Sequence, residues 1–384
     1  MLLVKMKTIH YICQYNNYSS NRELFVFPSS VTKIDYIKGA LKEAGYKIVL
    51  FSVAEGTTSN CNFIRSSRMQ IDGQESQIYI NTFGRSKLVY KIISRLWMFL
   101  QLLYYLLFKV KSGDAILVYH SLVIWPIISI FRFLSNKPFY FEIEESFAAA
   151  YSQSRDKIEV ECRYWHNASG YICVNDIIAE KSRLKGRVVV CYGDYKAKNI
   201  SVKVPPKDKV HILYAGFIEK EGTDAFIAAE TALYLNCNYC VNILGYGDNA
   251  NIALLKKRIE EVNLQLGYDG AVYHGCLNGR DYIDFMKNCH IGLTTRVLSD
   301  SFSDYTFPSK TLVYLCNNLI PVCSPISCIK KSEISDYVYF CDDVTPQSVA
   351  KVILMISFTK KIDYSDMLND LDRNFVIKLK ELFL

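Results

Sequence analysis

Short apolar runs that read as β-strands alternate along this chain with segments that have helical spacing. The first set of runs lies at residues 9–13, 47–53, 115–119, 139–143, 171–174 and 187–191. Between the first two runs, Ile34, Ile37, Leu41 and Ala44 recur on one helical face, and Gly45 ends that helix. Strands that are apolar throughout, with helices between them, indicate a parallel sheet covered on both faces.

A polar stretch at residues 203–209, Lys-Val-Pro-Pro-Lys-Asp-Lys, has the composition of a linker. After it the alternation restarts, with strands expected at residues 210–214, 239–244, 271–273, 290–294, 320–323 and 337–340. The expected fold class is α/β, with two doubly wound, Rossmann-like domains at residues 1–203 and 204–362. Such sheets bind ligands at the carboxyl ends of their strands, so a cleft between the two is expected. Residues 363–384 are expected to form a helix that packs back on the first domain.

Composition excludes several classes of protein. The chain has 384 residues, and its 45 Lys and Arg against 38 Asp and Glu leave a net charge of only +7. A nucleic-acid partner is therefore not expected. The thirteen cysteines include one Cys-x-x-Cys, at Cys237 and Cys240, without a second pair at zinc spacing. We expect reduced thiols, no bound metal and a cytoplasmic location, since the first residues also lack a signal-peptide pattern.

Residues 85–111 combine basic and apolar side chains. No acidic residue occurs between Ser76 and Gly113, and residues 96–108 are apolar except for Gln101. That run is shorter than the roughly 20 residues that span a bilayer. Two interpretations remain open: a helix lying on an anionic membrane surface, at the inner face of the cytoplasmic membrane, and an ordinary helix covering the first sheet.

The stretch Gly245-Tyr-Gly247-Asp-Asn-Ala250 matches the Gly-x-Gly-x-x-Ala dinucleotide fingerprint. A dinucleotide site needs an acidic residue after the next strand, to hold the ribose. Here that strand is followed by His274, Gly275 and Cys276. We therefore expect a tight strand-to-helix turn rather than a nicotinamide cofactor site.

A candidate anion site lies between Arg296 and Lys310. Arg296 follows a predicted strand, and Pro308 suits the first position of a helix, where its missing N–H costs nothing. The amides of Ser309 and Lys310 are then free at the helix start. Two cations, free amides and the helix dipole converge, which fits a diphosphate. Two solvated surface charges are the alternative.

The second half of the chain resembles the GT-B glycosyltransferases of retaining family 4, especially bacterial enzymes of capsular, O-antigen and exopolysaccharide synthesis. The resemblance covers about 150 residues in order and spacing. Its motifs are Tyr214-Ala215-Gly216, Lys220-Glu221-Gly222, Gly245-Tyr246-Gly247-Asp248, Tyr273-His274-Gly275, Thr294-Thr295-Arg296 and Phe307-Pro308-Ser309-Lys310. The first half matches more loosely, at Val118-Tyr119-His120 and Phe141-Glu142-Ile143-Glu144-Glu145.

The resemblance implies transfer, with retention of anomeric configuration and without a metal, from a nucleoside diphosphate sugar to a glycan or polyprenyl-diphosphate-linked acceptor. It implies that Arg296 and Lys310 neutralise the leaving diphosphate. The other residues that it places at the nucleotide sugar are Gly216, Lys220, Gly245, Gly247, His274, Tyr305, Phe307, Pro308 and Ser309.

Several positions depart from the family pattern. Phe217 replaces a frequent arginine, and Glu221 stands where the family's lysine usually precedes glycine. Val313 occupies the position of the glutamate that usually holds the ribose, and Tyr305 occupies the position of its partner glutamate. Asp300 or Asp304 could take over the role of the missing glutamate. Valine cannot accept a hydrogen bond, which costs on the order of 1 kcal/mol of donor affinity.

On the acceptor side, His120 follows a predicted strand. It is expected either to contact a substrate as a catalytic residue or to be a structural histidine. Glu144 and Glu145 also end a strand, and at most one of these adjacent carboxylates faces the cleft, where it could act as a base.

Three functions are compatible with these features. The first is the glycosyltransferase. The second is a catalytically degenerate binding subunit of a synthase complex, which Val313, Phe217 and Glu221 favour. The third is an epimerase or hydrolase on the same fold, although the acidic, histidine-rich cleft typical of those enzymes is missing from the sequence.

Overall fold

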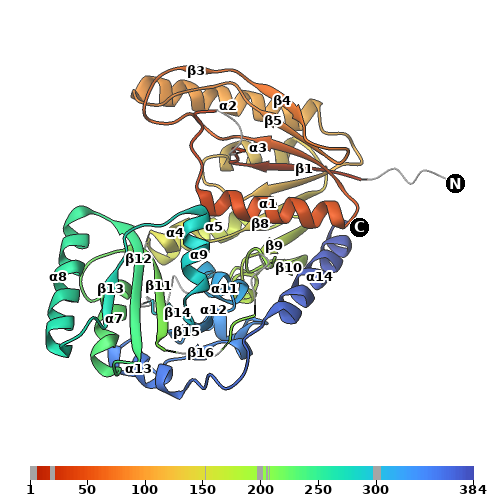
Figure 1. The fold of residues 1–384 in the computed structure, drawn as a ribbon. Coiled ribbons are helices and arrows are strands. Elements are labelled where there is room, and N and C mark those ends of the chain that lie inside the picture. The colour runs from red at the N-terminus through yellow and green to blue at the C-terminus, as the bar shows by residue number, and fades with distance from the viewer. Residues whose placement is uncertain are drawn as a thin grey trace. The chain divides into compact units, whose positions relative to one another are not determined.

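The computed structural model describes residues 7–17, 22–151, 153–196, 202–204, 206, 208–296 and 304–384. The chain divides into two compact units, one of Met1–Asp194 with Arg373–Leu384 and one of Tyr195–Asp372 (Figure 1). In each unit strands and helices alternate around a mainly parallel sheet, which confirms the predicted α/β, doubly wound fold class.

The first unit is built on an eight-stranded sheet in the order β10-β9-β8-β7-β1-β2-β5-β4. Neighbouring strands are parallel except for β4, which runs antiparallel to β5. The strands are β1 (Thr8–Cys13), β2 (Lys47–Ser52), β4 (Ser67–Gln70), β5 (Glu75–Tyr79), β7 (Ala115–Tyr119), β8 (Phe139–Ile143), β9 (Gly170–Cys173) and β10 (Arg187–Val190). A separate antiparallel pair joins β3 (Phe63–Ile64) to β6 (Thr82–Phe83).

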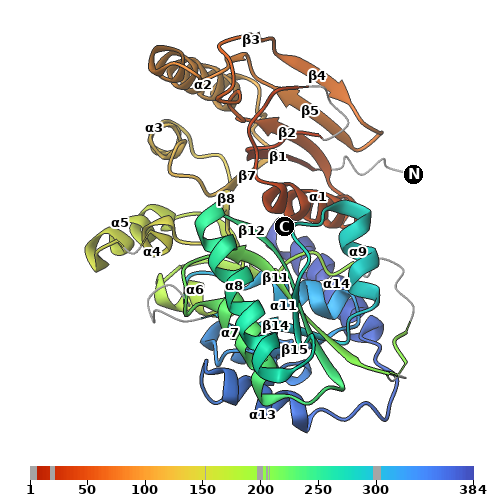
Figure 2. The ribbon, with the colours of Figure 1, turned by 60° about the vertical axis from the view of Figure 1, so that its left-hand side comes forward.

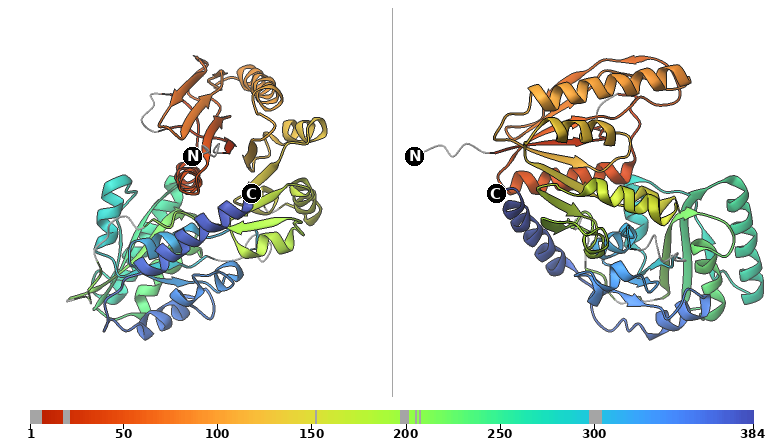
Figure 3. Two further views of the ribbon diagram at one scale, coloured as in Figure 1. Left: turned by 90° about the vertical axis from the view of Figure 1, so that its right-hand side faces the viewer. Right: turned by 180° about the vertical axis from the view of Figure 1, so that it is seen from behind.

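Helices cover both faces of this sheet. They are α1 (Pro28–Glu43), α2 (Leu88–Phe108), α3 (Trp125–Leu134), α4 (Phe147–Ala150), α5 (Arg155–Trp165) and α6 (Asp176–Lys181). Helix α1 begins with Pro28 at its first position and is followed by Gly45, whose φ of 93° only glycine adopts readily. Helices α2 and α3 lie side by side on the face opposite α1 (Figure 3).

The last turns of α14 (Ser365–Leu382) belong to the first unit. The Phe375 ring stacks on Tyr36 of α1, and the Arg187 guanidinium of β10 donates to the carbonyl of Glu381. A Cβ on Gly170 would press against Leu382. These contacts hold the C-terminal helix against the first sheet.

The second unit has a six-stranded parallel sheet in the order β13-β12-β11-β14-β15-β16. Its strands are β11 (Val210–Ile218), β12 (Tyr239–Gly247), β13 (Ala271–Tyr273), β14 (Ile291–Thr294), β15 (Ile320–Cys323) and β16 (Tyr339–Phe340). Its helices are α7 (Asp224–Thr231), α8 (Asn249–Leu266), α9 (Gly279–Lys287), α11 (Ser309–Cys316), α12 (Ser327–Lys330) and α13 (Pro346–Met355), with short 3₁₀ turns at Ala232–Tyr234 and Ser335–Tyr337. Helices α7, α8 and α13 pack on one face, and α9 and α11 pack on the other (Figure 2).

The units divide at different residues from those predicted. Lys203, at the start of the predicted linker, is buried, and its ammonium donates to the carbonyls of Met286 and Cys289 in the second unit. Its backbone also pairs with Ile362. The second unit runs from Tyr195 to Asp372 and therefore includes Lys203. Positions 205 and 207 of the predicted linker lie outside the described residues.

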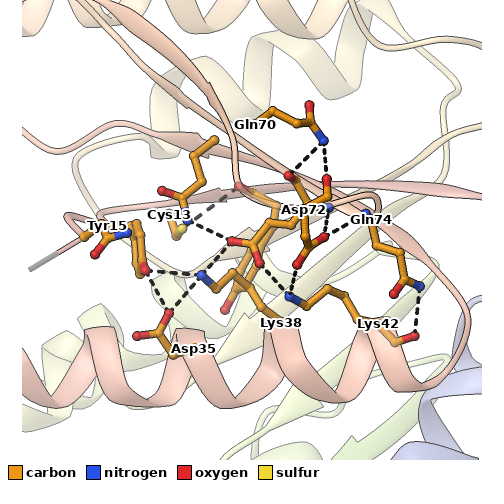
Figure 4. A network of polar contacts seen from close by, with 12 residues as sticks. Cys13, Tyr15, Asp35, Lys38, Lys42, Gln70, Asp72 and Gln74 are labelled. Atoms are coloured by element: carbon orange, nitrogen blue, oxygen red, sulfur yellow. Dashed lines mark hydrogen bonds and ion pairs between the residues drawn. The ribbon is translucent and has the colours of Figure 1, made fainter. Parts of the chain in front are cut away.

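Strands β4 and β5 were not expected from the sequence, because polar residues line them. Glu75 and Gln77 of β5 are buried, and charges on α1 make this possible. Lys38 pairs with Glu75 at 2.9 Å and with Asp35 at 2.9 Å, and Lys42 pairs with Glu75 at 2.9 Å (Figure 4). This network of ion pairs joins α1 to β5.

Helix α2 is longer than the apolar run that predicted it. It has 21 residues, and its length and composition would suffice to cross a membrane. Ser94, Met98, Leu102, Tyr105 and Leu106 are nevertheless buried, at the spacing of one helical stripe. The structure therefore uses α2 as a cover for the first sheet, with only 28% of the most apolar stretch buried.

Replacing Glu75 by Gln is expected to lower the free energy of unfolding by about 3 kcal/mol, because buried Lys38 loses the buried one of its two counter-charges. Burial raises the pKa of Glu75, but hydrogen bonds from Lys38 and Lys42 outweigh burial and lower it. The stabilisation is thus complete above a pH of about 4.3 and is lost as the pH falls through the lower folded-state pKa. Urea unfolding at pH 7 and at decreasing pH measures both effects.

The matched control is Glu43→Gln, at an exposed position of α1, the helix that carries Lys38 and Lys42. It is expected to change stability by less than about 0.5 kcal/mol. Equal destabilisation by the two substitutions would contradict a role for the buried ion pairs.

Candidate anion site

The two predicted cations occupy neighbouring positions at one edge of the second sheet. Strand β11 pairs in parallel with β14, so their carboxyl ends meet at the same edge. Arg296 follows β14 by two residues, and Lys310 is the second residue of α11, which packs on β14 and β15. Residues 297–303 between them, including the predicted substitute Asp300, lie outside the described residues.

The Lys310 ammonium lies against strand β11. Its Nζ is 4.6 Å from the centre of the Tyr214 ring, a cation–π distance. A Cβ on Gly216 would collide with Lys310 Nζ and lie 2.8 Å from its Cε. Gly216 therefore leaves room for the lysine in this position, which is a different reason from the predicted approach of backbone to phosphate.

Burial alters the protonation of this lysine. It lowers the pKa of Lys310 to about 8; Asp224 acts in the opposite direction, and the charge of Arg296 lowers the pKa further. Glu219 opposes the shift as well. The influence of Arg296 on Lys310 means that the two cations lie within electrostatic reach of each other, as an anion-binding pair requires.

Sequence reasoning missed the acidic partners of this site. Asp224 begins α7 and Glu219 follows β11, and both raise the pKa of buried Tyr214 after burial itself. Asp224 lies two residues after the Lys220-Glu221-Gly222 motif, and its carboxylate had no predicted role. The acids offset part of the positive charge when no anion is bound.

Helix α11 is anchored by a tyrosine. The ring of Tyr314 packs flat against Gly292, where a Cβ would overlap it. The Tyr314 hydroxyl donates to the carbonyl of Leu293 at 3.2 Å and accepts from the amide of Ala215 at 3.3 Å. These bonds fix the helix start relative to β11 and β14. Pro308 precedes the first helical residue, Ser309, one position earlier than predicted.

Gly245 and Gly247 have a steric role. Both lie inside strand β12, and a Cβ on either would collide with a carbonyl oxygen of β11, at Gly216 or Ile218. The helix that follows is capped by Asp248, whose carboxylate accepts from the amide of Asn251. The glycines therefore allow close pairing of β11 and β12 where a strand-to-helix turn was expected.

The remaining predicted donor residues lie at the same carboxyl edge, in different environments. Lys220 is exposed in the turn after β11, and Ser309 is exposed at the start of α11. His274 follows β13, and its Nε2 hydrogen-bonds to Asn242 at 3.0 Å. Phe307 is buried, whereas Tyr305 is half-buried.

Val313, which stands where the family has a glutamate, is half-buried. It packs against the core cluster under α9 and α11, as do Leu277, Tyr282 and Ile283. Valine has no group that could accept a hydrogen bond at this position.

His120 in the first unit is placed as a structural histidine. Its side chain is only 1% exposed, and its Nε2 lies 2.6 Å from the Glu161 carboxylate. Glu161 also accepts from the hydroxyl of Ser146 and from the amides of Phe147 and Ala148. Burial raises the pKa of Glu161, but the His120 bond outweighs it and lowers that pKa. Of the two alternatives expected for His120, this burial fits the structural histidine and does not fit a substrate contact.

The acids that end β8 also differ from expectation. Glu144 forms an ion pair with Lys33 at 2.9 Å, with its side chain 18% exposed. Glu142, which had no predicted role, is fully buried and accepts a hydrogen bond from Tyr11. Burial, followed by the charge of Glu144, raises the pKa of Glu142. Burial and the neighbouring Glu144 charge thus both favour the protonated form of Glu142.

Comparisons with known proteins identify the fold. No protein-family model matches the chain, and no curated protein matches it by sequence. The structure resembles the trehalose-6-phosphate protein from E. coli bound with UDP-2-fluoro glucose, with a TM-score of 0.66, 13% identity and 98% of each chain covered. It also resembles a UDP-forming trehalose-phosphate synthase from Burkholderia xenovorans, with a TM-score of 0.64, 10% identity and 98% of each chain covered.

These neighbours are GT-B glycosyltransferases, and the similarity extends over nearly the whole of both chains. The GT-B fold expected from the sequence motifs is thus confirmed. At this level of identity the likeness establishes the fold alone. It also does not select the capsular and O-antigen type, because the neighbours are trehalose-phosphate synthases.

The packing of the Lys310 side chain against Gly216 can be tested without a ligand. Gly216→Ala is expected to push the ammonium toward water and raise its pKa from about 8 toward the ordinary value near 10.4. NMR titration of the lysine ε-methylene groups, labelled with ¹³C, measures this change. Gly73→Ala, where a Cβ meets no neighbour, is the control. An unshifted Lys310 titration in Gly216→Ala would contradict the inferred packing.

Proposed function

We propose that this chain is a retaining, metal-independent glycosyltransferase that moves a sugar from a nucleoside diphosphate sugar to a glycan or lipid-linked acceptor. The observation that carries the proposal is the half-buried Lys310, whose ammonium lies over Gly216, within reach of Arg296, at the carboxyl edge of the second sheet. The shared fold with an E. coli protein bound to UDP-2-fluoro glucose supports it.

The proposed chemistry needs positive charge at the leaving group. As the sugar–phosphate bond breaks, negative charge grows on the diphosphate, and Arg296 and Lys310 compensate it. The free amides at the start of α11 add to this stabilisation. The acceptor oxygen bonds to the anomeric carbon on the face that the diphosphate leaves, and its proton passes to a phosphate oxygen. Two fixed cations do here what a divalent metal does in other transferases.

The proposed acceptor is a glycan on a polyprenyl diphosphate, in surface polysaccharide synthesis at the inner face of the cytoplasmic membrane. Two features support this finer assignment. The ordered motifs resemble those of capsular and O-antigen enzymes, and helix α2 presents an apolar face to the outside. One structural neighbour, by contrast, was determined with glucose-6-phosphate.

The outward face of α2 suits a membrane surface. Its exposed apolar residues are Leu88, Val89, Ile92, Ile93, Leu96, Trp97, Leu100, Tyr104 and Phe108, and the adjacent α3 adds Ile130, Phe133 and Leu134. The charged residues of α2 lie elsewhere: Lys91 is on the side of Met98, and Arg95 lies 3.5 Å from buried Glu55. Exposed Lys87 and Lys109 flank the helix, where anionic headgroups would lie.

A second candidate function is a GT-B subunit that binds a nucleotide sugar without transferring the sugar. The packing of Val313 into the α9–α11 core favours it, since a ribose contact is lost. Release of nucleoside diphosphate by the purified protein, given a donor panel and membrane acceptor, would exclude this candidate.

Nucleoside diphosphate binding is expected to depend on the protonation of Lys310. UDP or GDP should raise the melting temperature at pH 7.5, and Arg296→Ala or Lys310→Gln should weaken binding at least about tenfold. An anion favours the protonated lysine, so the dissociation constant should increase by up to about tenfold per pH unit above the free-state pKa of about 8. Isothermal titration calorimetry between pH 7.5 and 9.5 measures this slope.

Two variants sharpen this test. Lys310→Gln should remove the pH dependence, since the remaining Arg296 does not titrate. Lys257→Ala, an exposed cation on α8 of the same unit, should bind as the wild type does. Absence of binding by every nucleoside diphosphate tested would refute the proposed function.

Membrane contact through α2 is expected to depend on its outward leucines. The double substitution Leu96→Ser and Leu100→Ser should reduce partitioning onto anionic vesicles at least about tenfold, since both side chains lose apolar area in the bilayer interface. Adding Lys87→Gln should reduce it further in low salt. Co-sedimentation provides the measurement. Leu254→Ser with Leu264→Ser, exposed on α8, is the control, and an equal loss there would contradict the assignment.

A further inference from the structure

The first unit contains a cavity under helix α2 that the proposed sugar transfer does not use. Its volume is about 810 Å³, within the range of small-molecule sites. It lies between the carboxyl-terminal half of α2 and the face of the sheet formed by β1, β2 and β5. Thr8, His10, Val49, Phe51 and Ile78 line it from the sheet.

The floor of this cavity is apolar. Phe51 stacks on Tyr105 of α2 with ring centres 4.2 Å apart, and Ile78 and Ile80 lie alongside. The polar groups at the floor satisfy one another: His10 Nδ1 lies 2.7 Å from the Tyr105 hydroxyl, and His10 Nε2 lies 3.0 Å from the Asp114 carboxylate. An occupant therefore meets mainly hydrocarbon and aromatic surface there.

Four cations line the same cavity. Lys7 precedes β1, Arg68 lies on β4, and Lys109 and Lys111 follow α2. Arg68, Lys109 and Lys111 are exposed at the rim. The single acid in the lining, Asp114, already accepts from the Lys111 amide at 3.1 Å and pairs with His10. The rim therefore has an excess of positive charge that favours an anion.

The cavity adjoins the outward face of α2. Tyr104 lines the cavity and is also 54% exposed, and the Lys109 ammonium lies 5.4 Å from the centre of its ring. Tyr104 thus belongs both to the exposed surface of α2 and to the cavity wall. The lining includes residues before β1 and β7, whereas His120 and Glu144 follow the opposite ends of β7 and β8.

We propose that this cavity binds an aliphatic chain that ends in a phosphate, with the phosphate at Arg68 and Lys111 and the adjoining chain on Phe51 and Ile78. A purely polar anion would leave the apolar floor without contacts, and a neutral hydrocarbon would leave the cationic rim without a counter-charge. A ligand with both an apolar chain and an anionic group therefore fits the cavity better than either. Such a molecule has two natural sources, a membrane phospholipid and a prenyl-phosphate carrier. The cavity lies outside the proposed nucleotide site, and only its assignment to a prenyl-phosphate carrier rests on the proposed function.

Binding to the full-length protein is tested with soluble probes below their micelle concentrations. Farnesyl phosphate and dihexanoyl phosphatidic acid are the two amphiphiles, and farnesol and inorganic phosphate are the single-feature controls. At least one amphiphile should bind about tenfold more tightly than either control, as measured by calorimetry. The tighter of the two identifies the source. Inorganic phosphate binding as tightly as both amphiphiles would overturn the proposal.

Substitutions locate the site. Arg68→Gln and Lys111→Gln should each weaken amphiphile binding about tenfold, as expected for one charge-assisted hydrogen bond. Ile78→Phe should weaken it by filling the cavity without a change of charge, and its thermal unfolding shows whether it has folded. Arg65→Gln, next to β4 but outside the lining, is the charge-matched control.

The outcomes separate this proposal from the others. Lys310→Gln and the double substitution of Leu96 and Leu100 should leave amphiphile affinity unchanged, because neither touches the cavity. An effect of Arg65→Gln equal to that of Arg68→Gln would mean general electrostatic attraction and would overturn the site. Unchanged affinity in a folded Ile78→Phe protein, together with unchanged affinity in Arg68→Gln, would do the same.

Discussion

The candidate site depends on the packing of the half-buried Lys310, whose ammonium lies between the Tyr214 ring and Gly216. Removing an ammonium from water is costly, and here its pKa falls to about 8 as a result. The ring of Tyr214 and the charges of Asp224 and Glu219 offset only part of that cost, while Arg296 adds to it. In the free protein the charge of Lys310 is therefore only partly compensated. A bound diphosphate would supply the missing charge, which is why the geometry favours an anion over a neutral sugar.

Glycines make this arrangement possible through contacts between elements. Gly216 admits the lysine, Gly245 and Gly247 let β12 approach β11, and Gly292 receives the Tyr314 ring that fixes α11. Each is a place where one Cβ would displace a neighbour. The same Gly-x-Gly spacing that suggests a phosphate loop in the sequence thus has a sufficient explanation in strand packing. The charge that recognises the ligand comes from the side chains placed by that packing.

The sequence predicts most of the fold because its central strands are buried on both faces. Such strands read as continuous apolar runs, as β7 and β15 do. Strands β4 and β5 escape this reading because Glu75 is buried only through Lys38 and Lys42 of α1, a contact between distant residues. Helix α2 is longer than predicted because Ser94 and Arg95 interrupt its apolar run, although one of them is buried and the other approaches Glu55.

The candidate site follows the same division. Arg296 and Lys310 belong to local motifs at a strand end and a helix start, so the sequence places them. The pairing of His120 with Glu161, and the effect of Asp224 on Lys310, arise only when separate elements meet. The packing of helix α2 on the first sheet leaves apolar surface exposed. It is apolar on its outer face, and its inner face closes only partly on the sheet, leaving a cavity rimmed by cations. Among the described residues of the first unit both surfaces remain exposed, and the phosphate-bearing chain that we propose matches the apolar floor and the cationic rim of the cavity.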